Sequence, residues 1–296
     1  MTPASDAHPQ PPVPEVAQRW RDRRADYRRR GDLFDPSGWS VDVIARDRDA
    51  ASFVTTHHYS GSYPAARLRV GMYGPAETPA GPAPLMGVAV FSVPMTQSVI
   101  PSWCGVAPDA GVELGRFVLL PQVGFNGETW FLTRALVLLR DVLRIWRVVS
   151  FSDPLPRYDS WGREVKPGHI GQIYQALGAH YLGRTKARTL LLAPDGCVIS
   201  ERAISKIRKM ESGWEASARH IVALGADARQ AGEAPDAWLR RVLPVFRRLH
   251  HPGNHGYLFV NDRNYLLRTT GQAYLRQHPV SAQRAPTQED RHDDTR

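Results

Sequence analysis

A long apolar helix followed directly by a short apolar strand places the middle of this chain in a protein interior. Residues 128–145 carry apolar side chains on nearly every face of a helix, a pattern typical of buried helices. The apolar run 146–151 follows and ends in Ser152-Asp153-Pro154. In layered α/β sheets, ligands bind beyond the carboxyl ends of the strands. The sequence therefore predicts that Asp153 lies at a ligand-binding edge of a sheet, although an aspartate before proline is also an ordinary turn former.

The order of the other elements predicts an α+β fold. Apolar periodicity divides the chain into short strands and helices. The expected strands are 39–45, 68–73, 85–93, 112–120, 146–151, 189–193 and 197–200, the last two forming a hairpin. The expected helices are 15–30, 47–55, 128–145, 169–182, one or two within 201–226, and 236–251 with a break at Pro244. This order indicates one mixed, twisted sheet flanked by helices, with α/β-type layering.

The two ends of the chain differ in composition from its middle. Residues 1–14 are rich in proline and residues 281–296 lack apolar side chains that could pack, so we expect both to be disordered. Between them we expect a catalytic domain over 15–200 and a basic helical extension over 201–280. No apolar run approaches the roughly 20 residues that span a membrane, and the N-terminus lacks the apolar core of a signal peptide. With two distant cysteines and no metal-binding cysteine motif, we expect a soluble cytoplasmic protein.

The charge favours a polyanionic partner. The formal net charge is +9, and only four of the 38 basic residues are lysines. Arginine forks suit phosphates and guanine edges, although a GC-rich genome also enriches arginine without any functional purpose. Residues 237–261 contain four arginines and three histidines but no acidic residue. The residues expected to contact DNA phosphates are Arg202, Lys206, Arg208, Lys209, Arg240, Arg241, Arg247 and Arg248.

Four separate stretches place reactive side chains at predicted element ends or against apolar faces. They contribute His58 and Tyr59, Arg116, Asp153, and Tyr174. Arg116 shares a strand face with apolar residues, so we expect it to pair with a carboxylate, either Asp153 or Glu113. Each residue also has a structural interpretation, such as a helix cap for His58 or a core position for Tyr174. Together they supply an imidazole, a phenol, a guanidinium and an acid that one sheet could bring into one site.

The loop before the buried helix, PQVGFNGETW, has two glycines ahead of a helix N-terminus. Gly124 and Gly127 could expose backbone N–H groups to an anion. The order of elements around this loop resembles the GNAT acyltransferase fold, in which the equivalent loop binds the pyrophosphate of coenzyme A. That resemblance implies a cofactor-binding set of Gln122, Gly124, Asn126 and Gly127. Gly124 lies one position earlier than the GNAT pattern requires, a departure that weakens the case for acetyl-CoA.

More specifically, the chain resembles the phage Mom DNA-modification proteins, a diverged GNAT-like family. The similar stretches are HHYSG, ELGRFVLL, NGETWFLTRAL, VVSFSDP and GHIGQIYQALGAHYLGR, within about residues 40–200. The resemblance implies a transferase that converts adenine in double-stranded DNA to N6-carbamoylmethyladenine and so protects phage DNA from host restriction. It implies that His58, Tyr59, Arg116, Asp153 and Tyr174 are the catalytic residues.

The resemblance also implies a location and a cofactor. A phage- or prophage-encoded enzyme would act in the cytoplasm of the bacterial host. An iron ion would be held by His58, Tyr59 and Asp153, which offer nitrogen and oxygen ligands suited to iron. The donor of the carbamoylmethyl group and the oligomeric state are not indicated. Two other functions stay open: an acetyl-CoA-dependent N-acetyltransferase, and a basic DNA-binding protein without enzymatic activity.

Overall fold

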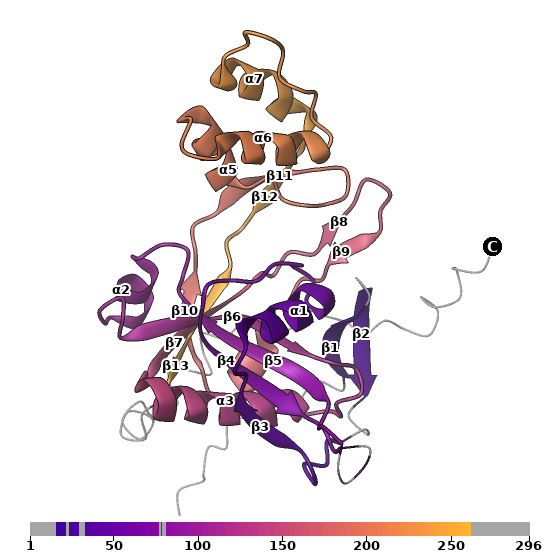
Figure 1. Cartoon of the computed structure of the whole chain (residues 1–296), viewed down its shortest axis with the longest axis vertical. Coiled ribbons are helices and arrows are strands. Elements are labelled where there is room, and N and C mark those ends of the chain that lie inside the picture. The colour runs from indigo at the N-terminus through magenta and orange to yellow at the C-terminus, as the bar shows by residue number, and fades with distance from the viewer. Residues whose placement is uncertain (1–15, 22–23, 30–32, 77, 79–80, 262–296) are drawn as a thin grey trace, which may run out of the picture.

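The computed structural model describes residues 16–21, 24–29, 33–76, 78 and 81–261, and its centre is a seven-stranded mixed sheet (Figure 1). The strand order across the sheet is β10-β13-β7-β6-β5-β4-β3. The strands are β3 (Ser40–Val43), β4 (Ala66–Tyr73), β5 (Leu85–Ser92), β6 (Gly111–Leu119), β7 (Arg147–Ser152), β10 (His180–Arg184) and β13 (His255–Val260). All neighbours are antiparallel except β6 and β7. The predicted α+β class with a mixed sheet is confirmed, and the specific likeness to GNAT proteins stays a prediction.

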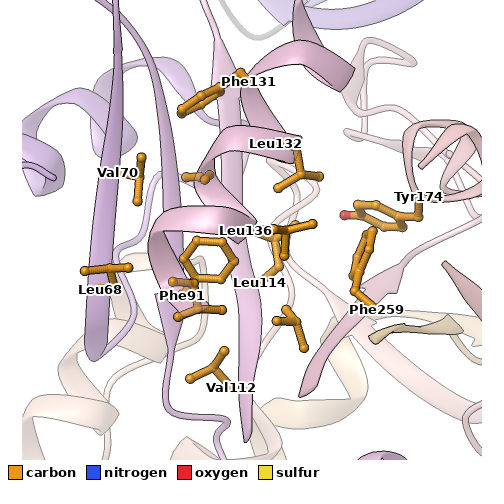
Figure 2. Packing of buried hydrophobic residues seen from close by; sticks show 14 of the residues in the cluster. Leu68, Val70, Phe91, Val112, Leu114, Phe131, Leu132, Leu136, Tyr174 and Phe259 are labelled. Atoms are coloured by element: carbon orange, nitrogen blue, oxygen red, sulfur yellow. The ribbon is translucent and has the colours of Figure 1, made fainter. Parts of the chain in front are cut away.

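Helices cover both faces of this sheet because its strands carry apolar residues on both sides. Along β5, Ala89 and Phe91 belong to the core beneath α3 (Gly127–Leu143), whereas Val88 and Val90 pack with α1 (Asp47–His57). This alternation follows from the period of two in a strand. The helix α2 (Val99–Cys104) covers β7 and β13. The buried helix predicted at 128–145 is therefore confirmed as α3, and Figure 2 shows its residues packed over the sheet.

The parallel strands β6 and β7 are paired over only three residues each. Gly111–Glu113 pairs with Arg147–Val149, and beyond this point no pairing joins the two strands, although both continue. The side chain of Tyr174 reaches this region from α4 (Gln172–Ala176) and lies edge-on against Phe259 of β13 (Figure 2). The separation of the two strands leaves Asp153 at the open end of β7 rather than in a continuous ladder.

A second lobe is inserted between β10 and β13. The pair β11 (Arg188–Leu192) and β12 (Arg247–His251) links it to the sheet (Figure 1). The lobe contains α5 (Glu201–Arg208), α6 (Trp214–Ala223), α7 (Pro235–Val242) and the short 3-10 helix η1 (Leu243–Val245). It has its own core, which includes Ile207, Ile221, Trp238, Leu239 and Phe246. The residues after 201 thus differ from the expected helical extension, because 247–260 forms two strands and β13 completes the central sheet.

Four predicted elements are wrong in type or length. The helix predicted over 236–251 ends as α7 at Val242, and Arg247–His251 forms the strand β12. Residues 16–29, expected to be helical, form the antiparallel strands β1 (Val16–Arg21) and β2 (Arg24–Arg29), whose backbone groups bond to each other. The helix predicted over 169–182 ends at Ala176, because the backbone turns at Gly178 (φ 74°) into the strand β10. The apolar residues of this segment occur at helical spacing, but they belong to two elements, α4 and β10, which bury different sides of the segment.

The strand β11 pairs mainly with β12, and its predicted partner at 197–200 makes only a single bridge, between Leu192 and Val198. A small hairpin that was not predicted, β8 (Arg157–Tyr158) with β9 (Glu164–Lys166), follows β7. The disorder predicted for 1–14 and 281–296 falls outside the described residues. Within the described part of the chain, no helix has the length and apolar character needed to cross a membrane.

Candidate active site

Asp153 lies directly after β7 and is held by three contacts. Its Oδ2 is 2.5 Å from Nζ of Lys166, and its Oδ1 accepts hydrogen bonds from Nε2 of His251 (2.8 Å) and the backbone N–H of Leu155 (3.0 Å). Burial by itself would raise the pKa of this carboxyl group. The charge and hydrogen bond of Lys166, with those from His251 and Leu155, outweigh burial and lower the pKa to about 2. Asp153 is therefore a carboxylate at neutral pH.

The two ring nitrogens of His251 have different hydrogen-bond partners, and these set its tautomer. Its Nδ1 accepts a hydrogen bond from the N–H of Gly253 at 3.0 Å, so the ring proton must be on Nε2, which donates to Asp153. The side chain is 1% exposed. Sequence reasoning placed His251 only in an acid-free basic stretch, because nothing in the local pattern shows that β12 ends beside β7. The contact depends on the tertiary structure, which buries this polar residue at the end of β12.

Lys166 forms the other side of this arrangement and was not predicted either. It ends β9 and is 3% exposed. Burial lowers the pKa of its ammonium group to about 8, against the opposing effect of Asp153 and with a further lowering by the charge of Arg157. At neutral pH the pair with Asp153 is therefore ionised. The ammonium group also lies 5.6 Å from the ring centroid of Tyr59.

His58 and Tyr59 follow α1 and lie together beside this ion pair. Their ring centroids are 4.2 Å apart. Nδ1 of His58 accepts from the N–H of Ser60 at 3.2 Å. Burial, followed by the charges of Arg116, His169 and Lys166, lowers the pKa of His58 to about 3, so the ring is neutral. Burial also raises the pKa of Tyr59, which keeps its phenol protonated.

Arg116 points into the same region but makes different contacts from those predicted. It donates to the carbonyl of Ser62 (2.9 Å), the hydroxyl of Ser62 (2.8 Å) and the carbonyl of Gly115 (2.5 Å). The predicted ion pair with Asp153 is wrong, since Lys166 takes that carboxylate. Glu113 acts on Arg116 only electrostatically, by raising its pKa together with Tyr59 against the lowering effect of burial. Arg116 therefore orders the loop after His58 and adds positive charge to the site.

Tyr174 lies beneath the cluster, within the core. Its ring makes edge-to-face contacts with Tyr257 at 5.4 Å and Phe259 at 5.7 Å between centroids. It is 7% exposed, and burial raises the pKa of its phenol despite a hydrogen bond with Ser150. A ring covered in this way has little free face for stacking on a base. Tyr59 interacts electrostatically with the hydroxyl of Tyr174 and raises its pKa further.

His169 is a further imidazole beside the ion pair. Its backbone N–H donates to the carbonyl of Asp153 at 2.9 Å, and burial, followed by the charge of Lys166, lowers the pKa of its ring to about 4. Gly168 permits this approach, because a Cβ there would lie 2.3 Å from the carbonyl oxygen of Pro154. The segment Pro167-Gly168-His169 therefore packs against the loop after β7, and the helix α4 begins only at Gln172.

The loop predicted to bind a cofactor is closely packed. A Cβ at Gly127 would lie 2.3 Å from Cγ1 of Val123, and the N–H of Gly127 bonds to the carbonyl of Gly124 at 3.2 Å. Asn126 adopts a positive φ of 71° and precedes α3. Packing thus accounts for Gly127 without a ligand. Gln122 is exposed beside this loop, and an open depression of about 410 Å³ lies nearby, lined by Phe34, Pro36, Asn126, Thr129, Trp130, Thr133 and Arg134.

Half of the predicted phosphate-contacting residues are engaged in ion pairs on the second lobe. Arg208 and Arg240 both pair with Asp236, at 3.0 and 2.6 Å. Arg241 pairs with Glu233 at 2.9 Å, and Arg202 pairs with Glu211. The arginines at the start of the acid-free stretch 237–261 therefore pair with acidic residues that lie just before it in the sequence. The other four predicted residues, which make no ion pair with a described residue, are Lys206, Lys209, Arg247 and Arg248.

An iron site at His58, Tyr59 and Asp153 does not fit this geometry. Both oxygens of Asp153 already accept hydrogen bonds or an ion pair, and the Lys166 ammonium group at 2.5 Å would repel a cation. Across the described residues, no three histidine, cysteine, aspartate or glutamate side chains form a group that could hold a metal ion. Iron thus stays a prediction from the resemblance, and none of the chemistry below depends on it.

The comparison with protein families decides the relationship. The model of the Mom protein family matches residues 39–231, about two thirds of the chain. The chain belongs to the Mom protein family. No curated protein matches it. The Mom match includes His58, Arg116, Asp153 and Tyr174 but ends before His251. Membership of the Mom family implies a general role in phage DNA modification, directed against host restriction.

Proposed function

We propose that this Mom-family chain converts adenine in double-stranded DNA to N6-carbamoylmethyladenine in the cytoplasm of the bacterial host. The observation that carries the proposal is the ionised Asp153, held at the open end of β7 by Lys166 and His251. It is surrounded by the neutral His58 and the protonated Tyr59. This arrangement provides a fixed negative charge to which an exocyclic amine could bind. The neighbouring His58 and Tyr59 are uncharged.

Asp153 would orient the amine rather than remove its proton. With a pKa of about 2 the carboxylate is a weak base. A carboxylate has about four lone-pair positions, and Lys166, His251 and Leu155 account for three contacts. The remaining position can accept one N6–H of adenine. A negative charge placed beside N6 also stabilises the positive charge that develops on the nitrogen as it forms a bond to carbon.

The proton balance assigns a second role. Formation of the N6–CH₂ bond displaces the donor's leaving group, and one proton must then leave N6. An alkylated exocyclic ammonium is a strong acid, so a neutral imidazole with a pKa of about 4 can accept this proton. We assign this acceptor role to His169, next to the ion pair. Arg116, with Tyr59 and the hydroxyl of Tyr174, would complete the polar wall of the site.

The test is nucleoside mass spectrometry of plasmid DNA from cells that express the chain. Wild-type protein should yield N6-carbamoylmethyladenine. Asp153→Asn, which keeps the shape but removes the charge, should reduce the yield at least about 100-fold, as expected for loss of a group that stabilises transition-state charge. Asp109→Asn, on an exposed loop far along the chain from β7, is the control and should leave the yield unchanged. Unmodified adenine with soluble wild-type protein would contradict the proposal.

A further inference from the structure

The β8–β9 hairpin projects an exposed tryptophan from the same element that supplies Lys166 to the site. The hairpin comprises residues 157–166, and Trp161 at its tip is 68% exposed. Building on the proposed function, we propose that this hairpin is a DNA wedge: Trp161 enters the base stack of duplex DNA and fills the space left when the target adenine is extruded. Enzymes that act on a base must take it out of the duplex, and apolar side chains inserted between base steps support such distortions.

The turn that presents Trp161 is held rigidly by one buried carboxylate. Oδ1 of Asp159 accepts from the N–H groups of Trp161 and Arg163, each at 2.9 Å, and Oδ2 pairs with Nε of Arg163 at 2.8 Å. The backbone N–H of Asp159 also donates to the carbonyl of Arg163 at 2.9 Å. A single exposed aromatic residue is ordinary on a protein surface. An aromatic residue on a turn fixed by four hydrogen bonds is preorganised for contact, because little conformational entropy is lost when it binds.

The orientation of the tryptophan ring is set by a cation. The guanidinium of Arg163, already paired with Asp159, lies 5.2 Å from the ring centroid of Trp161. This contact leaves the ring in solvent while restricting its position. Tyr158, in β8 of the same hairpin, is 46% exposed. The hairpin therefore offers two aromatic rings that can stack on bases, an interaction that tolerates any base because every base has a π face.

The hairpin is anchored at both ends, so its tip is fixed relative to the site. At its base, Lys166 pairs with Asp153. Near its tip, the N–H of Ser160 donates to the carbonyl of Pro194 at 2.7 Å, and Arg247 donates to the carbonyl of Tyr158 at 2.8 Å. Figure 1 shows the hairpin beside the β11–β12 pair, between the sheet and the helical lobe. Trp161 and Lys166 are five positions apart in the chain, which limits their Cα separation to about 17 Å at strand spacing.

The charge of the hairpin suits a phosphate backbone. Its acid Asp159 is used within the turn, and burial raises the pKa of its other acid, Glu164. Arg157 makes no ion pair with a described residue, and its buried Nε has no hydrogen-bond partner among them. A guanidinium in that state favours an anionic ligand. The charge of Arg157 acts on both Tyr59 and Lys166. It opposes the rise in the pKa of Tyr59 and adds to the lowering of the pKa of Lys166, which places this cation at the edge of the candidate site.

The wedge is tested by binding of the full-length protein to two DNA duplexes of the same sequence, one intact and one with a single central abasic position. An abasic position provides the gap without the cost of extrusion, so the wild-type protein should prefer it by about fivefold or more. Trp161→Ala should abolish this preference, and Trp161→Phe should retain most of it. Trp146→Ala is the matched control. Trp146 is 41% exposed but precedes β7, at the end of the strand opposite Asp153.

The outcomes separate the wedge from the proposed function. If Trp161→Ala keeps the preference, or if the wild-type protein shows none, the wedge is wrong. Modified adenine in plasmid DNA is measured in parallel, where Trp161→Ala should lower the yield at least tenfold while Trp146→Ala does not. A Trp161-dependent preference without any modified adenine in wild-type cells would leave the wedge standing and overturn the proposed reaction. Thermal melting of each variant confirms that the exposed substitutions leave the fold intact.

Discussion

His251 and Asp153 are 98 positions apart in the chain, yet Nε2 of the histidine donates to Oδ1 of the aspartate at 2.8 Å. The aspartate directly follows β7, inside the region that matches the Mom family, and the histidine ends β12, beyond that region. The whole second lobe lies between these two residues in the sequence. The carboxylate that we propose to bind the adenine amine is thus supported by a segment outside the family match.

The first prediction concerns this contact. His251→Ala should lower the free energy of unfolding by about 2 kcal/mol, because it removes a hydrogen bond to a largely buried carboxylate. It should also reduce the yield of modified adenine, since Asp153 loses one of its three fixed contacts. Urea unfolding and nucleoside mass spectrometry measure the two effects. His250→Ala, at the adjacent exposed position, should change neither quantity.

The second prediction concerns acid sensitivity. The pKa of His58 falls from 6.5 to about 3 in the folded protein, and that of His169 from 6.5 to about 4. Below pH 6.5 the unfolded chain therefore binds protons that the folded protein does not, so the free energy of unfolding should fall as the pH drops from 7 to 4. Asp153 adds to the loss below pH 4, because its folded pKa of about 2 is under the ordinary 3.8.

Unfolding by urea at pH 7 and pH 5 measures this effect. His169→Asn should reduce the difference between the two pH values, whereas His220→Asn, at an exposed position on α6, should not. Equal pH dependence in the wild-type protein and His169→Asn would show that the imidazole is not held neutral by burial.

The third prediction concerns Gly168. Gly168→Ala places a Cβ 2.3 Å from the carbonyl oxygen of Pro154, so the loop after β7 must shift. Because the next residue donates its N–H to the carbonyl of Asp153, this shift should move the carboxylate and lower the yield of modified adenine. Differential scanning calorimetry should record a lower Tm, and plasmid analysis a lower yield. Normal yield and Tm together would mean that the close approach is not needed.

The fourth prediction separates arginines that are available to DNA from those that stabilise the lobe. Arg248 is exposed and makes no ion pair with a described residue, whereas Arg241 is paired with Glu233 and Asp227. Arg248→Gln should weaken binding to any DNA sequence and reduce the slope of log affinity against log salt by about one. Arg241→Gln should leave the slope nearly unchanged and lower the Tm of the protein. Fluorescence anisotropy at several salt concentrations provides the measurement.

Much of the fold was accessible from the amino-acid sequence. Apolar periodicity located α1, α3 and five strands of the central sheet. Each of these elements buries one or both faces, and the spacing of its apolar residues is visible in the local sequence. The position of Asp153 directly after β7 could be predicted for the same reason. The errors fell on 15–30, 169–182 and 236–251, where helical propensity or spacing was outweighed by strand pairing. A further error fell on 197–200, whose neighbour β11 takes β12 as its main partner.

The composition of the site was only partly accessible. Residues predicted from their types and positions, such as His58, Tyr59, Arg116 and Asp153, do lie in one electrostatically coupled group. Lys166 and His251 were missed. Of the two carboxylates predicted to pair with Arg116, Asp153 pairs with Lys166, and Glu113 acts on Arg116 through its charge. Periodicity reports which side of an element faces the core, and this determined the layers and the strand end. Which side chains meet there depends on strand order and loop paths between distant segments, and those are decided by packing and hydrogen bonding of the whole chain.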